Sequence, residues 1–129
     1  MEESRVMSDG RDLDGAQILL VEDEYFVAVE LKTILGEVGA RVVGPVSRLQ
    51  PARDLARAER LDGAVLDVKL DGETTFPLAQ ELLERGVPVL FTTGFDSSIL
   101  PDRFKGSPCL AKPVNGPALQ RMALKHFRK

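Results

Sequence analysis

Several side chains that could do chemistry stand directly after short apolar runs of this chain. The acidic pair Glu22-Asp23, then Asp67, the pair Thr92-Thr93 and Lys112 occur in this order. A carboxylate at the end of a buried strand can act as a nucleophile or as a metal ligand. If the apolar runs are parallel strands, these groups emerge at one edge of a sheet, where open α/β sheets place their ligand sites. The sequence therefore predicts a site at that edge, centred on Asp67.

Each of these residues taken singly has a plain structural explanation. An acidic residue between a strand and a helix is often a helix cap, as Glu22-Asp23 could be. Asp67 could form a turn, and Thr93 suits a β-strand. Lys112-Pro113 alone indicates only an extended dipeptide. A shared site is therefore indicated by the ordered set and not by any one residue.

Apolar runs and amphipathic stretches alternate along the chain, which predicts the elements that must position these side chains. The expected strands are 17–22, 41–43, 63–67, 87–91 and 109–111. The expected helices are 24–38, 49–59, about 74–85 and 115–127, with a short or frayed helix within the Pro- and Gly-rich segment 94–107. Alternation of this kind favours a parallel sheet covered by helices on both faces, a doubly wound α/β fold.

Local signals predict where several of these elements begin and end. Gly39 is expected to end the first helix in a left-handed conformation, and Gly44-Pro45 to weaken the second strand. Asp71-Gly72 predicts a turn. Thr74 or Thr75 can cap the third helix, and Asn115 the last one.

The composition is that of one globular domain. The 129 residues are 43% hydrophobic and carry a formal net charge of −3, which argues against a broad nucleic-acid-binding surface. The single cysteine, Cys109, excludes an internal disulfide and favours a reducing, cytoplasmic setting. No apolar run approaches the length of a membrane span. We expect residues 1–15 to be a disordered leader and residues 16–129 to be the domain.

The ordered set resembles the receiver domain of two-component response regulators, over residues 17 to 127. The resemblance implies a flavodoxin-like fold: a five-stranded parallel sheet of strand order 2-1-3-4-5 with five helices, the fourth short or mobile. It also implies that Asp67 is a phosphoacceptor, whose carboxylate attacks phosphorus to give an aspartyl phosphate.

The same resemblance implies a magnesium ion, because a carboxylate and a phosphoryl group are both negative. Its ligands would be the carboxylates of Glu22, Asp23 and Asp67 and the backbone carbonyl of Lys69. Thr93 and Lys112 would each meet a phosphoryl oxygen, with Thr92 as the neighbouring alternative to Thr93. The Lys112-Pro113 bond resembles the family's cis peptide.

The chain departs from the family pattern in three places. One is Lys69, at a position where receivers have varied residues that tune the lifetime of the acyl phosphate. Cys109 stands where many receivers have an aromatic ring that moves with the threonine; the thiol is expected to be buried and inert, and a redox role is the alternative. The segment 91–95 partly resembles the Phe-Ala-Thr-Gly-hydrophobic-Tyr motif of a receiver subgroup, with Thr92 for Ala and Asp96 for Tyr. We expect an order–disorder change in residues 94–107 to replace the ring movement.

The resemblance implies a signalling protein and not an enzyme with a free substrate. We expect a single-domain response regulator, monomeric or weakly dimeric, that is phosphorylated by a histidine kinase or a histidine phosphotransfer protein. Its output would be contact with another protein. Tyr25, Phe26 and Val29 are candidates for docking the donor, although core packing is the expected role of at least one of them.

Two other functions are kept as alternatives. A receiver that is never phosphorylated could serve as a scaffold. A magnesium-dependent phosphohydrolase is disfavoured. The haloacid-dehalogenase motif has a second acid at the position where this chain has Lys69, and that motif lies on the first strand, whereas Asp67 ends the third expected strand. A nucleotide-binding module is disfavoured too, since no Gly-rich phosphate loop follows any strand.

Overall fold

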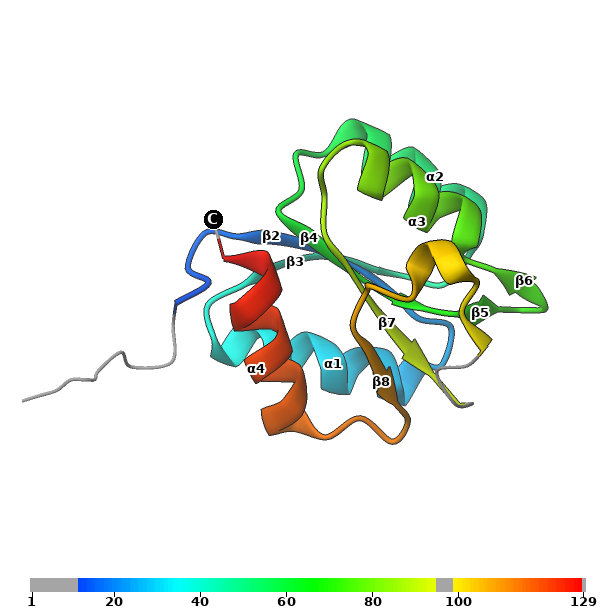
Figure 1. Ribbon diagram of the computed structural model, residues 1–129. Helices are drawn as coiled ribbons and strands as arrows, with labels where there is room; N and C mark the ends of the chain where they lie inside the picture. Colours follow the sequence, from blue (N-terminus) through cyan, green and yellow to red (C-terminus); the bar gives the residue numbers. More distant parts are fainter. Residues whose placement is uncertain (1–11, 95–98, 129) are drawn as a thin grey trace, which may run out of the picture.

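The chain folds into three layers, with a parallel sheet between two pairs of helices (Figure 1). The computed structural model describes residues 12–94 and 99–128. The sheet has the order β3-β2-β4-β7-β8, as expected from the sequence. Its strands are β2 (Gln17–Val21), β3 (Arg41–Val46), β4 (Gly63–Asp67), β7 (Val89–Thr93) and β8 (Cys109–Ala111).

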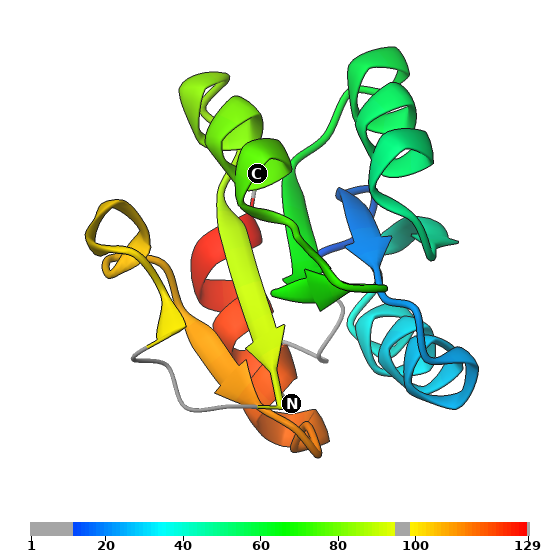
Figure 2. The ribbon, with the colours of Figure 1, turned by 90° about the vertical axis from the view of Figure 1, so that its right-hand side faces the viewer.

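The helices cover the two faces of the sheet in pairs, which Figure 2 shows from the side. One face carries α1 (Tyr25–Glu37) and α4 (Gly116–Phe127), and we call it the α1/α4 face. The other carries α2 (Leu49–Ala58) and α3 (Phe76–Glu84), and we call it the α2/α3 face. Between β7 and β8, the described residues contain only a three-residue 3-10 helix, η2 (Asp102–Phe104), where a short fourth helix was expected. Residues 95–98 lie outside the described part.

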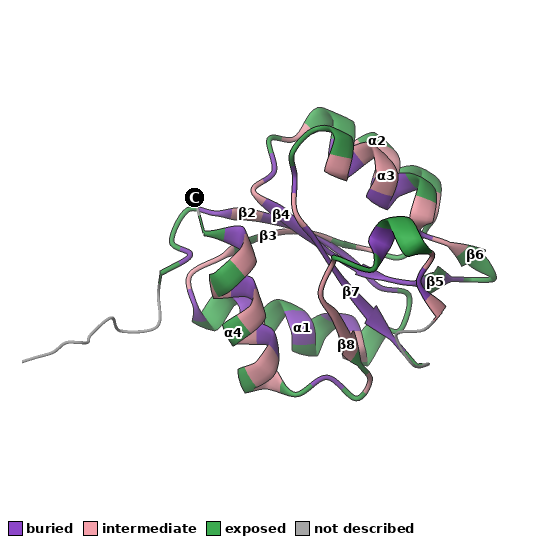
Figure 3. Cartoon of the chain, in the orientation of Figure 1, coloured by how far each residue is buried: buried purple, intermediate pink, exposed green. Residues whose placement is uncertain are grey.

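Each strand contributes side chains to the apolar cores on both faces of the sheet, because successive side chains point to opposite faces. On β4, Ala64 and Leu66 pack on the α2/α3 face, whereas Val65 packs on the α1/α4 face. Every residue of β4 and β7 is buried, as expected for central strands covered on both sides (Figure 3).

The second strand is longer than its sequence suggests. β3 continues through Gly44-Pro45, a cis peptide, to Val46, whereas the expected strand ends at Val43. Among the described residues it is an edge strand paired with β2 alone, and a proline is tolerated there because one side of the strand needs no partner. Gly44 has a φ of 109°, and a Cβ on it would meet the Leu20 carbonyl oxygen at 2.8 Å, so glycine alone fits.

The turn expected at Asp71-Gly72 is confirmed and closes a small hairpin that was not predicted. Its strands are β5 (Lys69–Leu70) and β6 (Glu73–Thr74). Both turn residues have a positive φ, 47° and 84°, as a two-residue type I′ hairpin requires.

The folded part begins earlier than residue 16, which corrects the expected extent of the leader. Leu13 is buried in the core of the α1/α4 face, and its amide donates a hydrogen bond to the Val38 carbonyl oxygen at 3.0 Å. Asp12 forms an ion pair with Arg128 at 3.4 Å, so the two ends of the described chain lie together. Residues 1–11 lie outside the described part. No helix in residues 12–94 or 99–128 is long and apolar enough to cross a membrane.

Candidate functional site

The expected site residues gather at the carboxyl edge of the sheet. In a parallel sheet all strands end at the same edge, so residues that follow neighbouring strands become neighbours. Val21 of β2 pairs with Leu66 of β4, which places Glu22 beside Asp67. Asp67 pairs in turn with Thr92 of β7, and Thr93 pairs with Ala111 of β8, the residue before Lys112.

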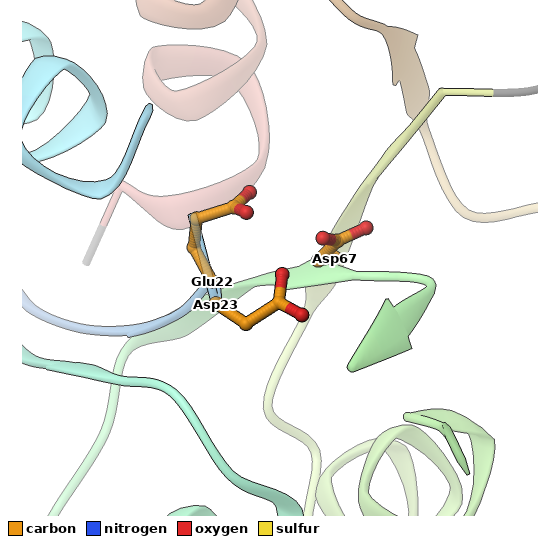
Figure 4. A group of neighbouring side chains, drawn as sticks. All are labelled: Glu22, Asp23 and Asp67. Carbon is orange, nitrogen blue, oxygen red and sulfur yellow. The ribbon is translucent and has the colours of Figure 1, made fainter. Parts of the chain in front are cut away.

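Glu22, Asp23 and Asp67 form a cluster of carboxylates, which we call the acidic cluster (Figure 4). One oxygen from each residue lies within 4.8 Å of the others. Glu22 and Asp67 are buried, while Asp23 is exposed and accepts a hydrogen bond from the Asp71 amide at 3.1 Å. Oxygen donors of this kind fit Mg²⁺, which commonly binds through one or two carboxylates plus substrate oxygens. The three carboxylates expected as metal ligands are therefore brought together.

Lys112 reaches from the end of β8 into the acidic cluster. Its Nζ donates to Asp67 Oδ2 at 2.9 Å and to Glu22 Oε2 at 3.2 Å. It also donates to Glu24 Oε1 at 3.2 Å. The Lys112-Pro113 bond is cis, as expected. One ammonium thus faces three carboxylates, which leaves an excess of negative charge for a divalent cation.

The protonation of this cluster follows from burial and hydrogen bonding. Burial raises the pKa of the Glu22 carboxyl, although the Glu24 amide and Lys112 oppose that shift. Burial alone would lower the pKa of Lys112, but its hydrogen bonds to Asp67 and Glu22 outweigh this and raise the pKa. Lys112 is therefore held as a cation at physiological pH.

The two threonines at the end of β7 are both buried but differ in their surroundings. Leu90 packs on the α1/α4 face and Phe91 on the α2/α3 face. Strand alternation therefore places Thr92 on the α1/α4 face and Thr93 on the α2/α3 face. The Thr93 carbonyl oxygen accepts from the Lys112 amide at 2.8 Å, which ties it to the site. Thr93 is the last strand residue, at the edge where the acidic cluster lies, and its expected contact with a phosphoryl oxygen stays a prediction.

Two further contacts of the site were missed by the sequence analysis. Glu24, the third acidic residue in a row, is a partner of Lys112, and that run of acids was the available signal. Thr75 occupies the cap position of α3 but makes no cap hydrogen bond, so the capping prediction for it is wrong. Its buried hydroxyl instead donates to the Asp67 carbonyl oxygen at 2.7 Å and holds the end of β4 against α3. The cap predicted at Asn115 is confirmed, with its side chain accepting from Ala118.

The structure says less about the roles expected for Lys69 and Cys109. The Lys69 amide approaches Asp67 Oδ1 at 3.4 Å, a long hydrogen bond, and the role of its carbonyl as a metal ligand stays a prediction. Cys109 is only partly buried, on the edge strand β8, and not fully buried as expected. Burial raises the pKa of its thiol, which disfavours a reactive thiolate.

The start of α1 presents an exposed apolar surface beside the acidic cluster. The exposed fractions are 73% for Tyr25, 84% for Phe26 and 45% for Val29, so the prediction that at least one of them packs in the core is wrong. The two rings contact each other edge to face, with centroids 5.3 Å apart. A hollow of about 390 Å³ lies beside Tyr25, and its lining residues are Glu22, Asp23, Tyr25, Ala28, Pro45 and Ser47.

Comparison with known proteins finds relatives with the same fold. No family model matches the chain. The transcriptional regulatory protein PdtaR of Mycobacterium tuberculosis is 28% identical in an alignment 129 positions long, which covers 92% of this chain but only 62% of PdtaR.

Two solved structures align along nearly their whole length. The solution structure of SdrG from Sphingomonas melonis Fr1 is 35% identical over 85% of this chain and 96% of SdrG, with a TM-score of 0.74. SdrG has also been solved in a BeF3-activated conformation. The receiver domain of the sensor histidine kinase PA1611 from Pseudomonas aeruginosa, with a magnesium ion coordinated in its active site cleft, is 27% identical. That alignment covers 89% of this chain and 99% of the domain, with a TM-score of 0.74.

Proposed function

This chain belongs to the response regulator receiver family, and from that premise we propose that Asp67 accepts a phosphoryl group from a phosphohistidine donor. The observation that carries the proposal is the contact of Lys112 Nζ with Asp67 Oδ2 at 2.9 Å, within the acidic cluster. A lysine, three carboxylates and the end of a buried strand in this arrangement suit phosphoryl transfer to a carboxylate.

Each side chain then has a defined task. An oxygen of Asp67 attacks phosphorus, the bond between phosphorus and the donor imidazole breaks, and the imidazole leaves with its electron pair. Glu22, Asp23 and Asp67 would hold Mg²⁺, which when bound supplies positive charge to the phosphoryl oxygens. The Lys112 ammonium shifts from the carboxylate to a phosphoryl oxygen as a point charge. Thr93 contributes its hydroxyl to another phosphoryl oxygen.

The donor is a histidine kinase or a histidine phosphotransfer protein, and it docks on the exposed start of α1. Tyr25 and Phe26 form an apolar contact surface that borders the acidic cluster, as a docking site for a donor must. The output is contact with a second protein. A cytoplasmic location and a monomeric or weakly dimeric state remain predictions.

Two rival functions fit the geometry less well. A scaffold that is never phosphorylated would have no use for the buried, charged contact of Lys112 with Asp67, which is costly to keep in a core. A phosphohydrolase of the haloacid-dehalogenase type would need an acid where Lys69 stands, and Lys69 is an exposed residue of β5.

The experiment is labelling with acetyl phosphate or phosphoramidate in the presence of Mg²⁺, read by intact mass. Wild type is expected to gain the mass of one phosphoryl group, and Asp67→Asn to gain none. Asp71→Asn is the matched control, because Asp71 is an exposed carboxylate four residues further on and asparagine tolerates its positive φ. Labelling of Asp67→Asn equal to that of wild type would refute the assignment. No gain in wild type, even from a phosphorylated histidine kinase, would favour the scaffold.

A further inference from the structure

The hydroxyl of Thr92 has no evident use in the fold. The residue is fully buried, and its Oγ1 makes no hydrogen bond to any residue that the structure describes. A buried polar atom without a partner destabilises a protein, and valine has nearly the same shape without that cost. A threonine here therefore points to a second state in which the hydroxyl is used.

Thr92 lies between the two charged groups of the site. Asp67 of β4 is its register partner on one side, and Leu110 of β8 is its partner on the other. Strand alternation places Thr92, Asp67 and Lys112 on the α1/α4 face, two residues after Leu90, Val65 and Leu110 respectively. Neighbouring strands are about 4.8 Å apart, so the hydroxyl lies one strand spacing from the Asp67 side chain.

In the resting state the Asp67 carboxylate is already engaged. Its Oδ2 accepts from Lys112 at 2.9 Å, and its Oδ1 has the long contact with the Lys69 amide at 3.4 Å. Lys112 crosses the end of β7 to make its bond, because β7 lies between β8 and β4 in the sheet. A phosphoryl group on Asp67 would attract this ammonium away from the carboxyl group. The oxygen of Asp67 that is not bonded to phosphorus would hold Mg²⁺ with one lone pair and could accept from another donor with its second lone pair.

We propose that Thr92 is a positioning residue whose hydroxyl donates to the Asp67 carboxyl group once Lys112 has moved to the phosphoryl group. The inference rests on the proposed function of Asp67. The resting form carries an unmet hydroxyl and the loaded form satisfies it, so Thr92 shifts the equilibrium toward the loaded form.

The test is a titration of the intact chain with beryllofluoride, a stable mimic of the phosphoryl group, in the presence of Mg²⁺. Affinity and melting temperature are measured for wild type, Thr92→Val and Thr92→Ser. Thr92→Val is expected to melt no lower than wild type without beryllofluoride, yet to bind it about tenfold more weakly, the equivalent of one hydrogen bond. Thr92→Ser, which keeps the hydroxyl, is expected to restore the affinity. Thr33→Val, on the exposed side of α1, is the control and should bind as wild type does.

Two results would overturn the proposal. Equal affinity of wild type and Thr92→Val would show that the hydroxyl is not engaged in the loaded state. A lower melting temperature of unloaded Thr92→Val with unchanged affinity would assign the hydroxyl to the resting fold, for example to a buried water. Failure of wild type itself to bind beryllofluoride would count against the function of Asp67, a result distinct from the other two.

Discussion

The two faces of the sheet are covered by different kinds of contact. The α1/α4 face is packed with aliphatic side chains, and the Phe127 ring of α4 lies directly on Gly63 of β4. The α2/α3 face instead holds three rings in mutual contact, Phe76, Phe91 and Phe104, which we call the aromatic group. Across the top of that face, Arg53 and Arg57 of α2 pair with Glu81 of α3.

The charged side chains of the site and the aromatic group therefore lie on opposite faces of the sheet. Alternation assigns the side chains of Glu22, Asp67 and Lys112 to the α1/α4 face. The aromatic group touches the same strand, β7, from the other face through Phe91, directly before the two threonines. Phe104 of η2 therefore brings a ring close to the site strand in a chain that has Cys109 where an aromatic is usual. The contact of Phe104 with Phe91 joins η2 to β7, and the expected change of residues 94–107 on phosphorylation stays a prediction.

The largest effect on the free energy of unfolding is expected from a substitution within the aromatic group. Phe104→Ala removes a ring that is 1% exposed and contacts two others, so we expect a loss of about 3–5 kcal/mol in the free energy of unfolding. Urea denaturation measures it. Phe26→Ala removes an 84% exposed ring and should change stability by less than about 0.5 kcal/mol. Similar values for the two variants would mean that the aromatic group does not stabilise this face.

A smaller effect is expected from crowding the other face. A Cβ on Gly63 would lie 2.3 Å from the Phe127 ring, so Gly63→Ala should cost about 1–3 kcal/mol in the same measurement. Gly36→Ala is the control, because a Cβ there meets nothing within 4 Å and alanine favours a helix by about 1 kcal/mol. A neutral Gly63→Ala would mean that α4 can move away from the sheet without cost.

The smallest effect is expected from the ion pairs between α2 and α3. Glu81→Gln removes the charge that faces Arg53 and Arg57, whose side chains are 28% and 56% exposed. Partly exposed pairs of this kind contribute about 0–1 kcal/mol, and less at high salt. Unfolding curves at low and high salt check this. A loss above about 2 kcal/mol would indicate that charge, and not the apolar core, holds this layer.

The sequence was sufficient for the sheet and the acidic cluster because both follow from local patterns. Each apolar run became a strand, and residues that follow parallel strands must meet at one edge. Leu13 was missed because a single leucine among polar residues has no periodicity that could reveal its packing. β3 was cut short because Gly44-Pro45 normally ends a strand, and only its edge position makes the extension possible. The aromatic group joins three successive elements, α3, β7 and η2, through rings 15 and 13 residues apart, and no helical or strand periodicity spans those separations.

The ion pair between Asp12 and Arg128 determines where a tether or a label can be joined to this domain. Both residues lie near the amino ends of β2 and β4, since Asp12 precedes β2 and Phe127 covers Gly63. Five-residue strands separate that edge from Glu22 and Asp67 by about 13 Å. A tether, a fluorescent reporter or a circular permutation that joins the two ends of the described chain would therefore leave the edge with the acidic cluster open. The domain can therefore be joined to a larger assembly at the edge opposite the acidic cluster.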